Sequence, residues 1–351
     1  MMKNYISILF VSVMGLCSSS LMGEELSKAK VPDLLPMVIL GSGPAGLAAA
    51  QYSVRLGMPT TLFMGQTSGG LLTKTSFIDN YPGVMKVAGD IFMDTMIEQT
   101  RQAGVKILDE TIVSVDLSQW PFMIGTEEGT MYRVLSLVIA TGATPKMLNV
   151  PGEETHYGNG VSSCALCDGL FFKGKDVFVI GGGDSAVEEA LQLAPHVKSV
   201  TCLVRSQQMR AAHSMQQKLQ GYPTIKPPRY GVQVKSILGN NEGVTGIEIL
   251  NIETNKTEVL DADGVFLAIG HHPNTDLFVG QLALSENGHI LVEGRTQATS
   301  VPGVFAAGDV EDDLYRQAIV AAGRGAAAAI DAVSWLRKQG VTEDALKQLA
   351  S

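Results

Sequence analysis

Two stretches of the chain repeat one order of apolar and polar positions. In residues 37–64, and again in residues 176–204, a short apolar run ends in a glycine-rich turn, and a helical stretch and a second apolar run follow. Short apolar runs bounded by turn signals predict buried strands. A strand, a glycine-rich turn, a helix and a strand within about 30 residues are typical of a βαβ unit. The pattern therefore predicts an α/β fold with two Rossmann-like nucleotide-binding domains.

Further apolar runs also end in turns that contain glycine, as expected of strands in an open parallel sheet, where ligands bind at the carboxyl edge. The expected strands are residues 37–40, 60–64, 137–140, 176–180, 199–204, 264–269 and 303–307. The expected helices that follow the two glycine-rich turns are residues 45–56 and 186–194.

Turns at residues 142–151 and 270–276 bracket the second unit. We interpret them as crossovers between domains, which makes the second domain an insertion into the first. The expected domains are residues 31–146 and 275–345 for the split first domain and residues 147–274 for the inserted domain.

The first 30 residues form a segment that resembles a leader. Residues 6–17 are mostly apolar and residues 18–23 are rich in small side chains, which is the layout of a secretory signal peptide. The apolar run is too short to predict a membrane span. The alternative is that translation begins at Met22 or Met37. We leave residues 1–30 out of the fold prediction.

Composition limits the classes of function. Hydrophobic residues make up 45% of the 351 residues and charged residues only 17%, which favours packed cores over a disordered chain. The formal net charge is −9 and no long block of Lys and Arg occurs. Nucleic-acid binding therefore has little electrostatic support.

The cysteines point to redox chemistry. The chain has four cysteines, too few for a disulfide scaffold, and only Cys164 and Cys167 are spaced as a pair. A CxxC pair is either redox-active or half of a zinc site, and the absence of a second CxxC or an HxxxH cluster favours the redox role. Asp168 follows directly and is a candidate proton donor or acceptor, or else a helix N-cap or turn residue. Cys202 lies in an apolar run and is expected to be a buried structural thiol.

The first glycine-rich loop fits the GxGxxG pattern of dinucleotide binding. Gly41 permits the tight turn, Gly43 lets the backbone approach a pyrophosphate, and Gly46 lets the helix pack closely on the strand. Amide groups at the start of the helix then bind the phosphates. No Asp or Glu ends the second strand, so this loop alone does not distinguish NAD from FAD.

The second loop carries Gly181 and Gly183, with Ala186 at the third small position. Arg205 follows the next strand, and Arg210 lies close behind it. Cations at this place pair with a ribose 2′-phosphate, which favours NADP over NAD. The alternative is a solvated basic turn.

Taken together, these motifs resemble the low-molecular-weight, bacterial-type thioredoxin reductases over residues 35–340. The resemblance is carried by residues 41–46, 79–83, 140–142, 164–169, 181–190, 268–271, 308–310 and 316–318. It implies an FAD-binding domain with an inserted NADPH-binding domain, and a homodimer. It also implies that electrons pass from NADPH through FAD and the Cys164–Cys167 disulfide to oxidised thioredoxin.

The resemblance assigns roles to individual residues. Cys167 would face the flavin, Cys164 would attack the disulfide of the partner, and Leu170 and Phe171 would either dock thioredoxin or belong to the core. The flavin would be lined by Gly41, Gly43, Gly46, Asn80, Asp309, Arg316, Gln317 and Ala318, with Asp309 bonded to its polyol; the last four could instead serve helix capping and packing. NADPH would be bound by Gly181, Gly183, Asp184, Ser185, Arg205 and Arg210.

Three positions depart from the family pattern. Ser206 stands where the family has a second Arg, which weakens the expected preference for NADPH. Leu71 replaces a Gln near the flavin. The leader indicates export, although the family is cytoplasmic and NADPH is a cytoplasmic cofactor.

Other functions fit parts of the pattern. A flavin-dependent dithiol oxidase would pass electrons to oxygen, and a ferredoxin–NADP-type reductase on the same fold would not need the CxxC pair. A third alternative is a non-catalytic nucleotide-binding scaffold, and a purified protein without the colour of a flavin would favour it.

Overall fold

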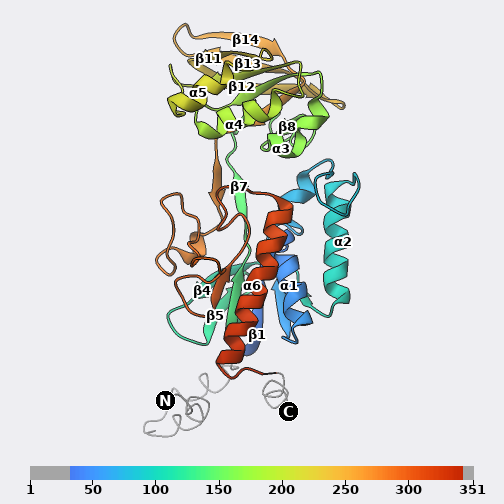
Figure 1. The fold of residues 1–351 in the computed structure, drawn as a ribbon, viewed down its shortest axis with the longest axis vertical. Helices are drawn as coiled ribbons and strands as arrows, with labels where there is room; N and C mark the ends of the chain where they lie inside the picture. The colour runs from blue at the N-terminus through green and yellow to red at the C-terminus, as the bar shows by residue number, and fades with distance from the viewer. Residues whose placement is uncertain (1–31, 343–351) are drawn as a thin grey trace, which may run out of the picture. The chain divides into compact units, whose positions relative to one another are not determined.

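The computed structural model describes residues 32–342, and the leader predicted at residues 1–30 lies outside this range. Within it the chain forms two α/β units, each built around parallel strands (Figure 1). The predicted fold class, α/β with two Rossmann-like units, is confirmed.

The first unit contains a seven-stranded sheet with the order β3-β2-β1-β6-β5-β4, and β17 pairs with β6. β1, β2 and β3 are parallel, as are β6 and β17, whereas β5 is antiparallel to both of its neighbours. The strands are β1 (Asp33–Leu40), β2 (Thr60–Phe63), β3 (Lys106–Leu108), β4 (Ile112–Asp116), β5 (Phe122–Thr126), β6 (Met131–Ile139) and β17 (Val304–Ala306).

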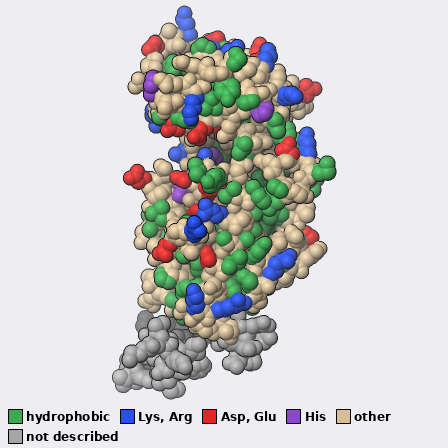
Figure 2. Space-filling model, viewed as in Figure 1, with side chains coloured by type: hydrophobic (Ala, Val, Ile, Leu, Met, Phe, Trp, Pro, Cys, Tyr) green, Lys and Arg blue, Asp and Glu red, His purple; other side chains and the backbone are tan. Residues whose placement is uncertain are grey.

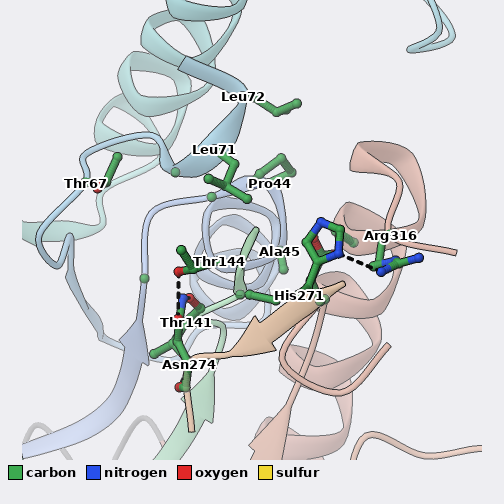
Figure 3. A pocket seen from close by; sticks show the side chains of 18 of the residues that line it. Pro44, Ala45, Thr67, Leu71, Leu72, Thr141, Thr144, His271, Asn274 and Arg316 are labelled. Atoms are coloured by element: carbon green, nitrogen blue, oxygen red, sulfur yellow. Dashed lines mark hydrogen bonds between the residues drawn. The ribbon is translucent and has the colours of Figure 1, made fainter. Parts of the chain in front are cut away.

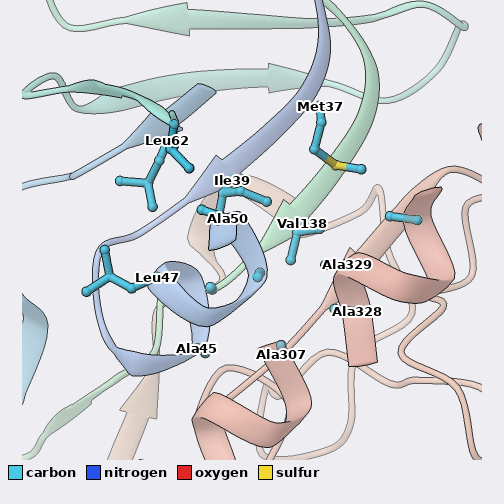
Figure 4. Packing of buried hydrophobic residues seen from close by; sticks show 14 of the residues in the cluster. Met37, Ile39, Ala45, Leu47, Ala50, Leu62, Val138, Ala307, Ala328 and Ala329 are labelled. Carbon is cyan, nitrogen blue, oxygen red and sulfur yellow. The ribbon is translucent and has the colours of Figure 1, made fainter. Parts of the chain in front are cut away.

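Small side chains allow two helices of this unit to pack closely. A Cβ on Gly325 would lie 2.0 Å from the carbonyl oxygen of Ala45, so these backbones touch directly. Figure 4 shows the same region, where Ala328 and Ala329 face a core that includes Ile39. The helices of the unit are α1 (Pro44–Arg55), α2 (Gly89–Gln102), α6 (Ala318–Lys338) and the 3-10 helices η3 (Gly70–Lys74) and η5 (Asp276–Phe278).

Helix α6 is also long and apolar enough to cross a membrane by length and composition, and it is the only such helix within residues 32–342. Its side chains Ala328, Ala332 and Leu336 are fully buried against the rest of the first unit. Core helices of soluble proteins pass the same test, so this feature is weak evidence for a membrane span.

The second unit contains a parallel five-stranded sheet with the order β11-β10-β9-β15-β8 and a three-stranded antiparallel sheet, β12-β13-β14. The strands of the parallel sheet are β8 (Val161–Ser162), β9 (Asp176–Ile180), β10 (Ser199–Val204), β11 (Ile225–Tyr230) and β15 (Gly264–Leu267). Those of the antiparallel sheet are β12 (Val232–Asn240), β13 (Gly243–Asn251) and β14 (Lys256–Asp261). The helices are α3 (Ala165–Asp168), η4 (Gly169–Phe172), α4 (Asp184–Leu193) and α5 (His213–Leu219).

A short antiparallel ribbon connects the two units. β7 (Ala143–Pro145) leads out of the first unit and β16 (His271–Pro273) leads back, and the two strands pair with each other. The strands of the second unit lie between β6 and β17 in sequence, so the second unit is inserted into the first. The domain boundaries after residues 146 and 274 stay a prediction.

Most predicted elements occur with small shifts of their ends. β9 and β10 have the predicted bounds, whereas β6 begins at Met131, well before the predicted start at residue 137. That prediction was too short because the first residues of β6 are polar or exposed and show no apolar run. α4 begins at Asp184 rather than at residue 186, since the helical backbone starts directly after Gly183.

Candidate active site

A cavity of about 980 Å³ opens between the first glycine-rich loop, the end of β6 and the inserted unit. Its volume falls in the range of ligand sites. Figure 3 shows side chains from distant segments around it, including Leu71, Thr141, His271 and Arg316. Both redox cysteines, Gly41 and Gly43 also line this cavity.

The first glycine-rich loop has the geometry that a dinucleotide requires. Gly41 has φ +104°, and a Cβ there would lie 2.3 Å from the carbonyl oxygen of Ala140. A Cβ on Gly46 would lie 1.9 Å from the carbonyl oxygen of Gly41, so only glycine permits this helix to approach the turn. A Cβ on Gly43 would meet no protein atom within 4 Å, which leaves its cavity side open to a ligand. These residues therefore fit a bound pyrophosphate.

Two further parts of the cavity wall differ from the predicted site residues. Leu71 and Leu72 of η3 line the cavity with apolar surface, where the resemblance implied one polar side chain. On another side, the Asn274 amide donates to the carbonyl of Thr141 over 2.8 Å, and Thr144 donates to Asn274 over 2.9 Å (Figure 3). This pair of bonds fixes the start of the ribbon beside the cavity.

The segment before α6 brings charged groups to the cavity. Asp309 lines it, and burial, followed by the charge of Asp312, raises the pKa of Asp309 to about 6. Asp312 accepts backbone N–H bonds from Leu314, Tyr315 and Arg316, which holds this turn. Arg316 has φ 46°, an uncommon backbone conformation that this turn imposes.

Arg316 and His271 form a bond across the cavity wall. The guanidinium of Arg316 donates to Nδ1 of His271 over 2.8 Å (Figure 3). Arginine has no acceptor, so Nδ1 of His271 carries no proton. Burial, and then the charge of Arg316, lower the pKa of His271 to about 4, which keeps the imidazole neutral.

Cys164 and Cys167 form a disulfide at the side of the cavity that the inserted unit provides. Cys164 is the N-cap of α3, and the N–H of Cys167 donates to Sγ of Cys164 over 3.1 Å. Gln317 Nε2 approaches Sγ of both cysteines at 3.9 Å, and the Asn80 amide donates to Gln317 over 3.4 Å. The disulfide therefore contacts residues of the first unit.

Asp168 lines the same cavity as the disulfide. Burial raises its pKa; the hydrogen bond from Ser162 opposes this, and the charge of Asp79 adds to it. Ser162 donates to Asp168 over 2.6 Å and accepts the N–H of Cys164 over 3.0 Å. The side chain of Asp168 caps no helix, so the alternative role as N-cap is not the one it plays.

Glu189 is a site residue that sequence reasoning missed. It lines the cavity from α4, and its carboxylate accepts the N–H of Ala165, directly after Cys164, over 2.5 Å. Burial raises its pKa to about 7, against the hydrogen bond from Ala165 and the charge of Arg316. The one sequence signal for this contact is that Glu189 lies among the apolar residues that α4 buries.

The glycines of the second glycine-rich loop lie outside this cavity. Gly181 has φ +150° and lies tightly against Ala268, whereas a Cβ on Gly183 would meet no protein atom within 4 Å. Ser185 lines the cavity, but Gly181, Gly183, Asp184, Arg205 and Arg210 do not. Arg205 and Arg210 are exposed, and the N–H of Arg210 donates to the carbonyl of Gly182 over 2.6 Å. The backbone of Arg210 is therefore bonded to the second glycine-rich loop.

The remaining predicted residues fall into two groups. Gln317 and Ala318 line the cavity, whereas Gly46 and Asn80 do not and act through Gly41 and Gln317. Gln317 stands at the N-cap position of α6 but makes no side-chain capping bond. Cys202 is buried, as predicted, and burial raises the pKa of its thiol to about 12.

Comparisons with known proteins agree with this site. The chain matches the family model described as pyridine nucleotide-disulphide oxidoreductase over residues 35–325. It is 44% identical to the thioredoxin reductase of Rickettsia typhi over 309 residues, which cover 86% of this chain and 98% of that one. It is 40% identical to the thioredoxin reductase of Coxiella burnetii, covering 86% of this chain and 96% of that one.

Solved structures give the same result. The thioredoxin reductase from Giardia duodenalis is similar with a TM-score of 0.82 and 38% identity, covering 87% of this chain and 99% of that one. The thioredoxin reductase from Streptococcus pyogenes is similar with a TM-score of 0.82 and 33% identity, covering 88% and 100%. The chain therefore belongs to the pyridine nucleotide-disulphide oxidoreductase family and, within it, to the thioredoxin reductases.

Proposed function

We propose that this protein is a thioredoxin-disulfide reductase that passes electrons from NADPH through FAD and the Cys164–Cys167 disulfide to oxidised thioredoxin. One observation carries the proposal: the disulfide and the dinucleotide loop at Gly41 and Gly43 line one cavity. The names of the relatives support the same activity.

The two cofactors are assigned to different loops. FAD would be held by the first loop and by Asp309, Arg316, Gln317 and Ala318, with Asn80 bonded to Gln317. NADPH would be held by Gly181, Gly183, Asp184 and Ser185, and Arg205 and Arg210 would supply cations for its 2′-phosphate. When bound, the flavin accepts a hydride from the nicotinamide and supplies two electrons to a disulfide.

The residues of the chain carry out the thiol chemistry. The Cys164 thiolate attacks a sulfur of the partner disulfide, which forms a mixed disulfide and releases one partner thiolate. The Cys167 thiolate then attacks Cys164, re-forms the internal disulfide and releases the second partner thiolate. Asp168 holds the proton that a departing thiolate takes up, since its raised pKa keeps it protonated to higher pH.

Leu170 and Phe171 are proposed to dock thioredoxin. Leu170 is 57% exposed, although it is a large apolar side chain next to the active-site helix. Phe171 is only partly buried and packs on Phe77 of the first unit, with ring centroids 6.1 Å apart. A partner that contacts Phe171 has to displace this pair, so domain rotation about the β7–β16 ribbon would precede docking.

A homodimer is proposed from the surface of the first unit. Apolar side chains gather over α1 and α6 (Figure 2), and Tyr52, Ile319 and Ile330 are each more than 40% exposed. Association through this face would bury them. Sedimentation analysis tests this, because Ile330→Glu should yield monomers while the parent protein sediments as a dimer.

Export is proposed from the leader pattern at residues 1–30 alone. Sequencing the N-terminus of protein from its native host tests it. A mature chain that begins after Ser20 or Gly23 supports export, and one that begins at Met1, Met22 or Met37 contradicts it.

An assay with NADPH or NADH, with and without thioredoxin, tests the proposed activity. Thioredoxin-dependent oxidation of NADPH by a yellow protein is expected, and the Cys164→Ser, Cys167→Ser double variant should lose it. Cys202→Ser is the matched control, because that thiol is buried and does not line the cavity. Activity that survives the double variant favours a ferredoxin–NADP-type reductase. Oxidation of small dithiols by oxygen without NADPH favours a dithiol oxidase.

A further inference from the structure

We propose that Glu189 is a positioning residue that sets the reactivity of the Cys164 thiol, because its carboxylate binds the amide next to Cys164 and places a negative charge beside it. The inference deepens the proposed function, since Cys164 is the thiol that attacks the partner.

The contact is specific. Glu189 Oε2 accepts the N–H of Ala165 over 2.5 Å, and Ala165 is joined directly to Cys164. Sγ of Cys164 accepts a hydrogen bond from the N–H of Cys167, and the N–H of Cys164 donates to the hydroxyl of Ser162. The bond from Glu189 thus completes the set that holds the turn between the two cysteines, and it ties this turn to α4.

The charge of Glu189 is weakly compensated. No ion pair to this carboxylate occurs within residues 32–342. The charged groups that face it are Glu188 on its own helix, Asp168 from α3 and Arg316 from the segment before α6. Arg316 is the only cation among them, and its guanidinium is bonded to His271. An ionised Glu189 therefore adds a negative charge that this single, already bonded cation offsets only in part.

This arrangement makes the effect depend on pH. Burial raises the pKa of Glu189 to about 7, so the side chain is neutral well below this pH and charged above it. A charged neighbour disfavours the Cys164 thiolate, which raises the pKa of the thiol. Below pH 7 the restraint disappears, because Glu189 is then protonated. The thiol reactivity of the wild type should thus rise less steeply with pH than that of a single isolated thiol.

Alkylation of Cys164 tests the proposal without thioredoxin or NADPH. The flavin-loaded protein is reduced with a phosphine, and the rate of its reaction with iodoacetamide is followed by mass spectrometry from pH 5 to pH 9. In Glu189→Gln the amide oxygen still accepts the N–H of Ala165, so the variant removes the charge and keeps the bond. We expect equal rates for both proteins near pH 5, and a rate about threefold or more higher for the variant near pH 8.

Matched variants separate charge from structure. Glu188→Gln removes the adjacent exposed charge and should raise the rate less than Glu189→Gln does. Glu189→Ala removes both charge and bond and should also react faster near pH 8. Flavin absorbance and the thermal midpoint establish that each variant is folded. A rate ratio that stays at one across the pH range, or a slower Glu189→Gln, overturns the proposal. If the wild-type protein showed no NADPH-dependent turnover with thioredoxin, the proposed function would be overturned. The alkylation rates would still test the role of Glu189, because they require neither NADPH nor thioredoxin.

Discussion

Arg316 donates a hydrogen bond to His271, and this bond joins the segment before α6 to the ribbon strand β16. The two residues lie 45 positions apart in the sequence. Since Arg316 is a permanent cation, the bond requires a neutral imidazole with its acceptor at Nδ1. Protonation of His271 at Nδ1 would therefore break this bond beside the cavity.

The burial of His271, together with the nearby charge of Arg316, predicts a loss of stability in acid. The pKa of His271 is lowered from 6.5 to about 4, so between these values the unfolded chain binds a proton that the folded protein does not. Stability that is present above pH 6.5 is lost as the pH falls toward 4, on the order of 2 kcal/mol. His271→Asn keeps an acceptor and cannot titrate, so its urea midpoint should fall less steeply over this range. A variant with the same slope as the wild type would rule out His271 as the cause.

Replacing either of two glycines in the first loop should have different effects. One replacement should lower the stability of the protein, and the other should weaken FAD binding. Gly46→Ala places a Cβ against the carbonyl of Gly41, and we expect a loss of about 1–3 kcal/mol even without cofactor. Gly43→Ala meets no protein atom, so the apoprotein should keep its stability and bind FAD more weakly. Thermal melts of apoprotein and flavin titrations of both variants measure the difference. Equal destabilisation of the two apoproteins would contradict it.

Replacing Asp168 should slow thiol chemistry without loss of the flavin. Asp168→Asn keeps the bond to Ser162 and removes the titratable proton, so turnover with thioredoxin should fall by about 10²-fold. Stopped-flow reduction by NADPH and the flavin content should stay close to those of the wild type. If the variant turns over at the parent rate, the proton comes from another group.

Ser206 predicts a modest preference between NADPH and NADH. Its hydroxyl is bonded to the carbonyl of Gln208, and the side chain is exposed beside Arg205. Ser206→Arg adds a charged donor for the 2′-phosphate, which should raise the ratio of kcat/KM for NADPH over NADH about tenfold. Gln217→Arg on α5 adds the same charge at an exposed position farther along the chain and should change the ratio less. Equal effects of both variants would indicate general electrostatic attraction only.

Local pattern predicted much of the fold. Strands β9 and β10 and the three glycines of the first loop follow from apolar runs and from turn geometry, which neighbouring residues determine. The antiparallel sheet β12-β13-β14 was not predicted, because none of its strands is a continuous apolar run. β12 begins with alternating buried and exposed positions, polar residues and glycine interrupt β13, and β14 is almost entirely exposed.

Contacts between distant segments could not be predicted in the same way. The bond from Ala165 to Glu189 depends on how α3 docks on α4, and the approach of Gln317 to the sulfurs depends on how the two units meet. No short pattern encodes such distances. The cysteines, Asp168 and the glycines were predicted because their chemistry is carried by adjacent residues.

The ribbon of β7 and β16 has a consequence for protein engineering. Pro145 and His271 are paired partners, so the chain leaves the first unit and returns to it at neighbouring points. A segment with adjacent ends can be exchanged for a homologous one without rerouting the backbone of its host. The inserted unit can thus be treated as a cassette, in which nucleotide preference and the dithiol are transplanted together while the first unit stays unchanged.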